Sequence, residues 1–234
     1  MPLSFVQKIT EPFLFKHHVV LENLPESILV RIHERFKPRT FSDGEVLFRQ
    51  GNYAKGACFL RSGLVKIAQS TPQGQRQIIY VYTVGDLVGY RHLLSSEAYS
   101  MEATAVGRVD VDFIPAELFV QLVREEPLFA HNLLIALSQE FSVWVNRMTF
   151  FLRYPVRTRL AICLLTLYKQ YAVAGHQPPA IVFSRTDLAD FVGATLETTV
   201  RTLSEFRDKG WLESKGRRIL LTAPEELANA AGSI

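Results

Sequence analysis

Two charged side chains near the carboxyl end of this chain have the types and spacing that can distinguish base pairs in DNA. Glu197 and Arg201 lie four residues apart in a segment with helical periodicity, so they share one helix face. An arginine can donate two hydrogen bonds to guanine, and a glutamate can accept one from the cytosine amino group. A solvated ion pair between the two side chains is the alternative interpretation. The pair is thus a candidate for reading double-stranded DNA.

Two short helices joined by a tight turn would position this pair. Ser184 can cap a first helix, since Asp187 three residues on can return the bond. Gly193 permits a sharp turn, and Thr195 can cap a second helix that ends at Gly210. The turn is short enough for a helix-turn-helix motif that reads DNA.

Helical spacing also predicts which face of the second helix is buried. The predicted inward residues are Leu196, Thr199, Val200, Leu203 and Phe206. The predicted outward residues are Glu197, Thr198, Arg201, Thr202 and Glu205. After this helix, two short apolar runs flank a turn over 214–217, which predicts a β hairpin. The hairpin tip would carry Lys215, Arg217 and Arg218, which suit contacts to DNA phosphates.

The segment SRTDLADFVGATLETTVRTLSEFRDKGWLESKGRRI resembles the winged helix of the CRP/FNR family of bacterial transcription regulators. The resemblance places the family pattern E-T-x-x-R on 197–201, which implies base reading by Glu197 and Arg201, with Leu196 and Thr198 beside them. It also implies phosphate contacts at Arg185, Thr195, Thr198, Lys215 and Arg217. Leu196 matches the apolar residue of the FNR branch and could touch a thymine methyl group. Val200 replaces the serine of that branch.

A second region, over 26–119, alternates short apolar runs with Gly, Pro, Asn and Asp, which predicts a small β barrel. It resembles the cyclic-nucleotide-binding jelly roll of the same family, including the R-x-G-x-V pattern at Arg61-Gly63-Val65. The expected fold is α+β, with an N-terminal jelly-roll barrel, a long dimerisation helix and a C-terminal winged helix-turn-helix. The expected boundaries are 1–25 for an N-terminal segment, 26–122 for the sensor barrel, 123–152 for the helix and 153–234 for the DNA-binding domain.

The connecting helix, over about 127–152, has apolar residues at coiled-coil spacing. They are Ala130, Leu134, Leu137, Phe141, Trp144, Met148 and Phe151. The residues alone leave open whether this stripe packs on the chain's own barrel or on a second copy. Family members dimerise through the helix at this place, so the resemblance implies a homodimer. A twofold dimer could set two recognition helices on half-sites one DNA turn apart.

The resemblance also indicates an effector pocket, and here the chain departs from the family. The positions aligned with nucleotide contacts are Gly85, Asp86, Tyr99, Ser100 and, from the helix, Trp144. Tyr99 replaces the arginine that binds the cyclic phosphate, and Glu140 adds a negative charge, which disfavours cAMP. Heme is another candidate cofactor, because His92 and Pro2 loosely resemble the ligands of a heme-binding branch. The small-molecule effector therefore stays unknown.

Composition and missing motifs narrow the function further. Of 234 residues 48% are hydrophobic, and residues 153–234 carry 11 Lys and Arg against 8 Asp and Glu. No secretory leader, membrane span or metal-binding set is apparent, so we expect a cytoplasmic protein that needs no metal. Catalytic motifs are missing too, so an enzyme is not expected. RNA polymerase is an implied partner. The alternative is a ligand- or heme-binding sensor whose winged helix contacts protein.

Overall fold

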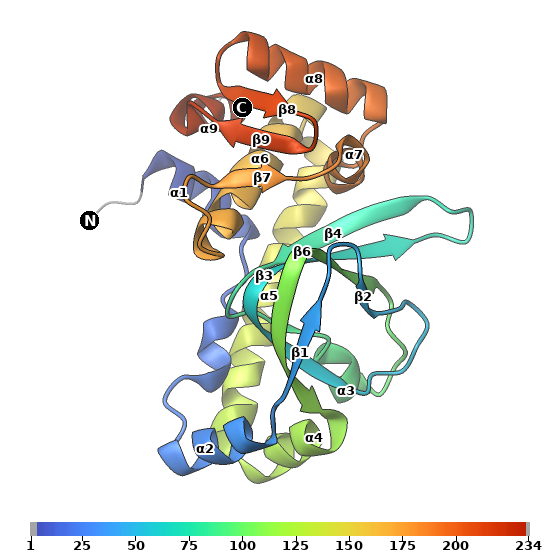
Figure 1. The fold of residues 1–234 in the computed structure, drawn as a ribbon, viewed down its shortest axis with the longest axis vertical. Helices are drawn as coiled ribbons and strands as arrows, with labels where there is room; N and C mark the ends of the chain where they lie inside the picture. Colours follow the sequence, from blue (N-terminus) through green and yellow to red (C-terminus); the bar gives the residue numbers. More distant parts are fainter. Residues whose placement is uncertain (1–3, 233–234) are drawn as a thin grey trace. The chain divides into compact units, whose positions relative to one another are not determined.

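The computed structural model describes residues 4–232, which form two compact units. One unit holds most of the β structure and consists of 15–69 and 81–141. The other consists of 4–14, 70–80 and 142–232 and is mostly helical. The predicted α+β class with a β-rich N-terminal part and a C-terminal helix-turn-helix is confirmed (Figure 1).

The larger sheet has six strands, and most of its pairing involves its two longest ones. The strands are β1 (Lys37–Phe41), β2 (Val46–Phe48), β3 (Gly56–Ser70), β4 (Arg76–Tyr82), β5 (Leu87–Val88) and β6 (Glu102–Pro115). Their order is β1-β6-β3-β4, with β2 also paired to β6 and β5 to β3. β1 and β3 run antiparallel to β6 on its two sides. Gly63 lies at a register shift between β3 and β6 with φ +79°, where a Cβ would come within 2.3 Å of the Arg108 carbonyl oxygen.

Helices close the apolar face of this sheet within the same unit. They are the 3-10 turn η2 (His17–Leu21), α2 (Glu26–Arg35), α3 (Arg91–Ser95), α4 (Ala116–Glu125) and the first half of α5 (Pro127–Arg153). The core they share includes the fully buried Ile32, Leu87, Phe119 and Phe129. Asn132 on α5 donates to the backbone oxygens of Val20 and Glu22, which fixes η2 on this helix.

Helix α5 has two apolar faces, and only one of them is covered. The exposed face consists of Leu134, Phe141, Val145, Met148 and Leu152, which are 45 to 76% exposed. Their spacing is that of a coiled-coil seam. Of the predicted seam residues, Leu134, Phe141 and Met148 lie on this exposed face. The others, Ala130, Leu137, Trp144 and Phe151, are half-buried.

The helical unit surrounds a second, three-stranded sheet. Its elements are α1 (Phe5–Thr10), the 3-10 turn η1 (Glu11–Phe13), α6 (Val156–Val173), β7 (Ala180–Val182), α7 (Arg185–Val192), α8 (Leu196–Asp208), β8 (Leu212–Lys215), β9 (Arg218–Leu221) and α9 (Pro224–Gly232). The strands follow the order β7-β9-β8 (Figure 1). Helix α6 is buried along most of its length. None of the described helices combines the length and apolar character needed to span a bilayer.

The first residues of the chain, for which the sequence indicated no role, pack within the helical unit. α1 lies against α6 and α9. The ring of Phe13 meets that of Phe150 edge to face at 5.7 Å. Asn146 Nδ2 donates to the Pro12 backbone oxygen at 2.9 Å. The N-terminal segment therefore does not form a separate appendage, and its first part stabilises the unit that contains α7 and α8.

Candidate nucleic-acid interface

The first helix of the motif, α7, begins and ends as its sequence predicts. The Ser184 hydroxyl oxygen accepts from the Asp187 backbone N–H at 2.9 Å, which satisfies a free donor at the helix start. Gly193 ends the helix in the left-handed conformation, with φ +67°. Arg159 of α6 then donates to the carbonyl oxygens of Val192 and Gly193 at 2.8 and 3.1 Å. This guanidinium occupies the free carbonyls at the helix end and fixes the turn.

The second helix, α8, buries three of the five residues predicted to face inward, namely Thr199, Leu203 and Phe206. Its buried residues are Thr199, Thr202, Leu203 and Phe206. Val200 and Leu196, which were expected inside, are 40% and 49% exposed. Threonine can take the inner positions because each hydroxyl donates to the carbonyl one turn earlier, at 2.9 Å, so no polar group is left unsatisfied.

The solvent-exposed face of α8 carries both apolar and charged side chains. Leu196, Glu197, Val200 and Arg201 are all exposed. Among the described residues no ion pair joins Glu197 to Arg201, so the pairing considered as an alternative does not form. Glu205 is exposed as expected, and its carboxylate pairs with Arg157 at 3.2 Å. The face available for base edges is therefore the first two turns of α8.

The residues expected to touch phosphates lie around this face. Thr195 caps α8 by accepting from the Thr198 backbone N–H at 3.2 Å, and Thr198 is half-buried. The strands β8 and β9 form the predicted hairpin, with Lys215 opposite Arg218 across a turn at Gly216 and Arg217. Lys215 and Arg217 are exposed at this tip. These positions suit register-setting contacts to a DNA backbone.

Arg185 differs from the other basic candidates because it is only partly accessible. It is the first residue of α7 and half-buried. Burial lowers the pKa of its guanidinium from the usual value. One nitrogen, Nη1, is buried without a hydrogen-bond partner in the described part of the chain. An anion at the start of α7 would supply that missing acceptor.

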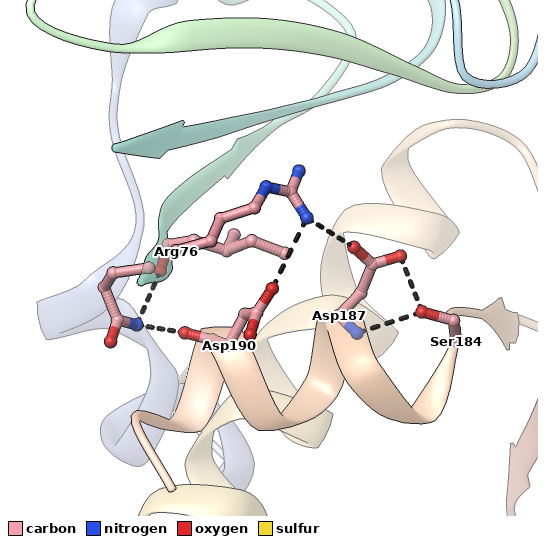
Figure 2. Close-up of polar contacts among 6 residues, drawn as sticks. Arg76, Ser184, Asp187 and Asp190 are labelled. Carbon is pink, nitrogen blue, oxygen red and sulfur yellow. Dashed lines mark hydrogen bonds and ion pairs between the residues drawn. The ribbon is translucent and has the colours of Figure 1, made fainter. Parts of the chain in front are cut away.

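A hairpin distant in sequence holds α7 from its other side, which the sequence did not indicate. In Figure 2, Arg76 at the start of β4 reaches two carboxylates one turn apart on α7. Its Nη1 lies 3.1 Å from Asp187 Oδ1 and 3.4 Å from Asp190 Oδ2. Gln77 Nε2 donates to the Asp190 backbone oxygen beside them. Residues 70–80 belong to the same compact unit as α7, so this clamp is part of the frame that orients the motif.

We expect the Arg76 and Asp187 side chains to be energetically coupled. In a double-mutant cycle of Arg76→Ala and Asp187→Ala, the coupling free energy should be about 1 kcal/mol, because the pair is largely shielded from water. Hydrogen exchange of the α7 amides would measure it. A cycle of Arg76→Ala with the exposed, distant Asp208→Ala should give no coupling. A coupling of zero in the first cycle would contradict a clamp.

The residues expected to form the effector pocket have different local surroundings. Gly85 and Asp86 form a turn, in which Asp86 Oδ2 accepts from the Thr83 backbone N–H at 2.9 Å. Ser100 is exposed, whereas Tyr99 is buried and stacks on Phe48 at 3.9 Å between ring centroids. Trp144 belongs to the other compact unit. Tyr99 also lines a cavity of about 600 Å³.

The cofactor candidates also find limited support in the local chemistry. His92 Nε2 accepts from the Ser100 backbone N–H at 3.2 Å, so the lone pair that would bind a heme iron is engaged. Pro2 lies outside the described residues. In the same unit the buried Tyr90 hydroxyl donates to Glu140 Oε1 at 2.5 Å. The Glu140 carboxylate is an acceptor and offers no donor to a cyclic phosphate, which disfavours cAMP in this unit.

Comparison with known proteins yields two family models that cover most of the chain. Residues 38–126 match the cyclic nucleotide-binding domain, and residues 158–230 match the Crp-like helix-turn-helix domain. The chain is 28% identical over 229 residues to the fumarate and nitrate reduction regulatory protein of Escherichia coli K12, covering 97% of this chain and 88% of that protein. The corresponding protein of Klebsiella oxytoca shows the same identity and coverage.

Solved structures show the same fold. FixK2 of Bradyrhizobium japonicum superposes with a TM-score of 0.72 at 23% identity, over 85% of this chain and 98% of its own. The c-di-GMP responsive global regulator CLP of Xanthomonas campestris gives a TM-score of 0.71 at 20% identity, over 84% and 99%. At these identities the similarity to both structures applies to the fold alone.

Proposed function

The chain belongs to the CRP/FNR family of bacterial transcription regulators, and we propose that it binds a pseudo-palindromic promoter site as a homodimer. The observation that carries this proposal is the exposed start of α8. There Glu197 and Arg201 stand one turn apart, unpaired with each other, beside two apolar side chains. A major groove offers partners for such a set: guanine and cytosine for the charges, and a thymine methyl group for Leu196 or Val200.

The dimer is supported by the exposed apolar stripe on α5. Five large apolar side chains at coiled-coil spacing over about 18 residues form a patch of the kind that marks an interaction site. In a twofold dimer the stripe would pack on its own copy, which is why an isologous contact fits it. Each half of the dimer would then offer one α8 to one half-site.

Regulation of DNA binding is assigned to the β-rich unit. We propose that the β-rich unit binds a small effector and biases the geometry of the dimer, which requires unequal affinity of the effector for two states. RNA polymerase is the expected protein partner at the promoter. The proposed site of action is the cytoplasm, where bacterial promoters lie.

The β8–β9 hairpin allows an experiment that separates contacts to DNA phosphates from contacts to bases. Lys215→Ala should weaken binding to specific and random DNA alike and reduce the slope of log Kd against log salt by about 1, because one counterion-releasing contact is lost. Fluorescence anisotropy over a salt series measures both quantities. Lys8→Ala, an exposed lysine of α1, is the matched control and should leave the slope unchanged. An unchanged slope for Lys215→Ala would remove the wing from the interface.

A further inference from the structure

The β-rich unit contains a pocket that is separate from the turn at Gly85 and Asp86. Its volume is about 600 Å³, within the range of small-molecule sites. β1, β2, the loop over 49–55 and the start of β3 contribute most of its lining. A second hollow, at Gly89 to His92 and Met101, measures about 20 Å³, room for a single water. The first of these two pockets is therefore the one with room for a small molecule.

The walls of the larger pocket are held in place without a ligand. The Gly51 N–H donates to the Tyr99 backbone oxygen, and the Tyr99 N–H donates to the Asn52 oxygen, each at 2.8 Å. The Ala116 N–H holds the Lys55 backbone oxygen at 3.0 Å, which fixes the far end of the loop. Stacking of Phe48 on Tyr99, with planes 13° apart, makes one wall flat and rigid. A pre-formed pocket of this type loses little entropy on binding.

The absence of a side chain at Gly56 shapes a second part of the pocket wall. A Cβ there would come within 2.4 Å of the Phe113 ring and 2.2 Å of the Ile114 carbonyl oxygen. Glycine thus lets the Phe113 ring lie against the backbone. The Arg39 guanidinium covers that ring at 3.5 Å from its centroid. The arginine thereby lies against an aromatic ring of the pocket, and the residue as a whole is exposed.

The charged residues that line the pocket are all cationic. Arg39 and Lys55 are both exposed at its rim, and its lining contains no Asp or Glu. Neither cation has a carboxylate partner among residues 4–232. Deeper in the pocket, Cys58 is buried, and burial raises the pKa of its thiol to about 12, so it adds no negative charge. The interior is therefore neutral and aromatic, and the rim is cationic.

We propose that this pocket binds a small organic anion with a flat apolar body. The body would lie between the Phe48–Tyr99 stack and Phe113, and its carboxylate or phosphate would accept hydrogen bonds from Arg39 and Lys55. Arginine suits this position because its planar fork matches both anions. Binding at this pocket does not require DNA binding. Identifying the bound anion as the effector rests on the proposed function.

The test is calorimetric titration of the full-length protein, without DNA, with 2-naphthoate, 2-naphthyl phosphate and the neutral 2-naphthamide. We expect at least one anion to bind about tenfold or more tighter than the amide, and Arg39→Gln and Lys55→Gln each to weaken it by about tenfold. Arg124→Gln, an exposed arginine on α4 outside the pocket, should change nothing.

Three results would overturn the proposal. They are equal affinities for the acid and the amide, unaltered anion affinity in both pocket variants, and no binding of either anion up to about 1 mM. Because the titration contains no DNA, its failure leaves the proposed DNA binding untouched. Conversely, a protein that binds the anion but no promoter would contradict only the proposed function.

Discussion

Arg201→Ala is expected to weaken binding to the preferred DNA site by about 1–3 kcal/mol, roughly a 5- to 150-fold rise in Kd. The reason is geometric. Arg201 is exposed on the first turns of α8, where a guanidinium can donate two bonds to one guanine, and alanine can donate none. Affinity for random DNA should fall much less, since this contact reads a base. Competition anisotropy with specific and random duplexes would measure the ratio.

Arg207→Ala is the matched control for that experiment. Arg207 is exposed near the end of the same helix, where it pairs with Asp208 at 3.2 Å. Arg207→Ala removes one positive charge, as Arg201→Ala does, but leaves the residues proposed to contact bases unchanged. If Arg201→Ala kept the affinity and base preference of the natural protein, α8 would not be a recognition helix of the kind proposed.

The second large effect is expected at the seam of α5. Phe141 is 69% exposed, and Phe141→Glu would place two carboxylates near each other across a twofold contact. Burying such a ring stabilises the dimer by about 1.5–3 kcal/mol. Burying an unpaired carboxylate in its place destabilises the dimer, because the charge loses its hydration. We expect a monomer of 26.5 kDa at micromolar concentration, with specific DNA affinity largely lost. Sedimentation velocity measures the mass.

Val30→Glu controls for the general effect of a new surface charge. Val30 lies on α2 and is 48% exposed, away from the stripe on α5. That variant should stay dimeric. A dimeric Phe141→Glu with natural circular dichroism would place the contact between copies elsewhere on the molecule.

The order and type of the elements in the helix-turn-helix were predictable because each boundary has a local cause. Ser184 and Thr195 cap the two helices, and Gly193 takes a conformation that other residues avoid. The inward face of α8 was predicted less well. Thr199, Leu203 and Phe206 are buried as predicted, whereas Thr202 was assigned outside and is buried, and Val200 was assigned inside and is exposed. Back-bonded threonines make a helix face more apolar than its composition suggests.

The seam of α5 shows a different limit of sequence analysis. A helix with apolar residues on two faces offers two overlapping sets of coiled-coil spacing, and periodicity alone does not say which set meets the chain's own core. Leu134, Phe141 and Met148 of the predicted stripe lie on the exposed face, which also includes Val145 and Leu152, two residues outside that stripe. Contacts between segments that are distant in the sequence were not predicted either. Neither the clamp of Arg76 on α7 nor the pocket between Arg39 and Tyr99 follows from local spacing.

The central claim is that two α8 helices of a dimer read two half-sites, and selection of bound duplexes from a random DNA library tests it most directly. We expect enrichment of an inverted repeat whose half-site centres lie about 10–10.5 base pairs apart. Each half-site should require a guanine at the position that Arg201 contacts. In a parallel selection with Arg201→Ala, that guanine should lose its preference. Enrichment of no sequence, or of a single site without twofold symmetry, would contradict the account.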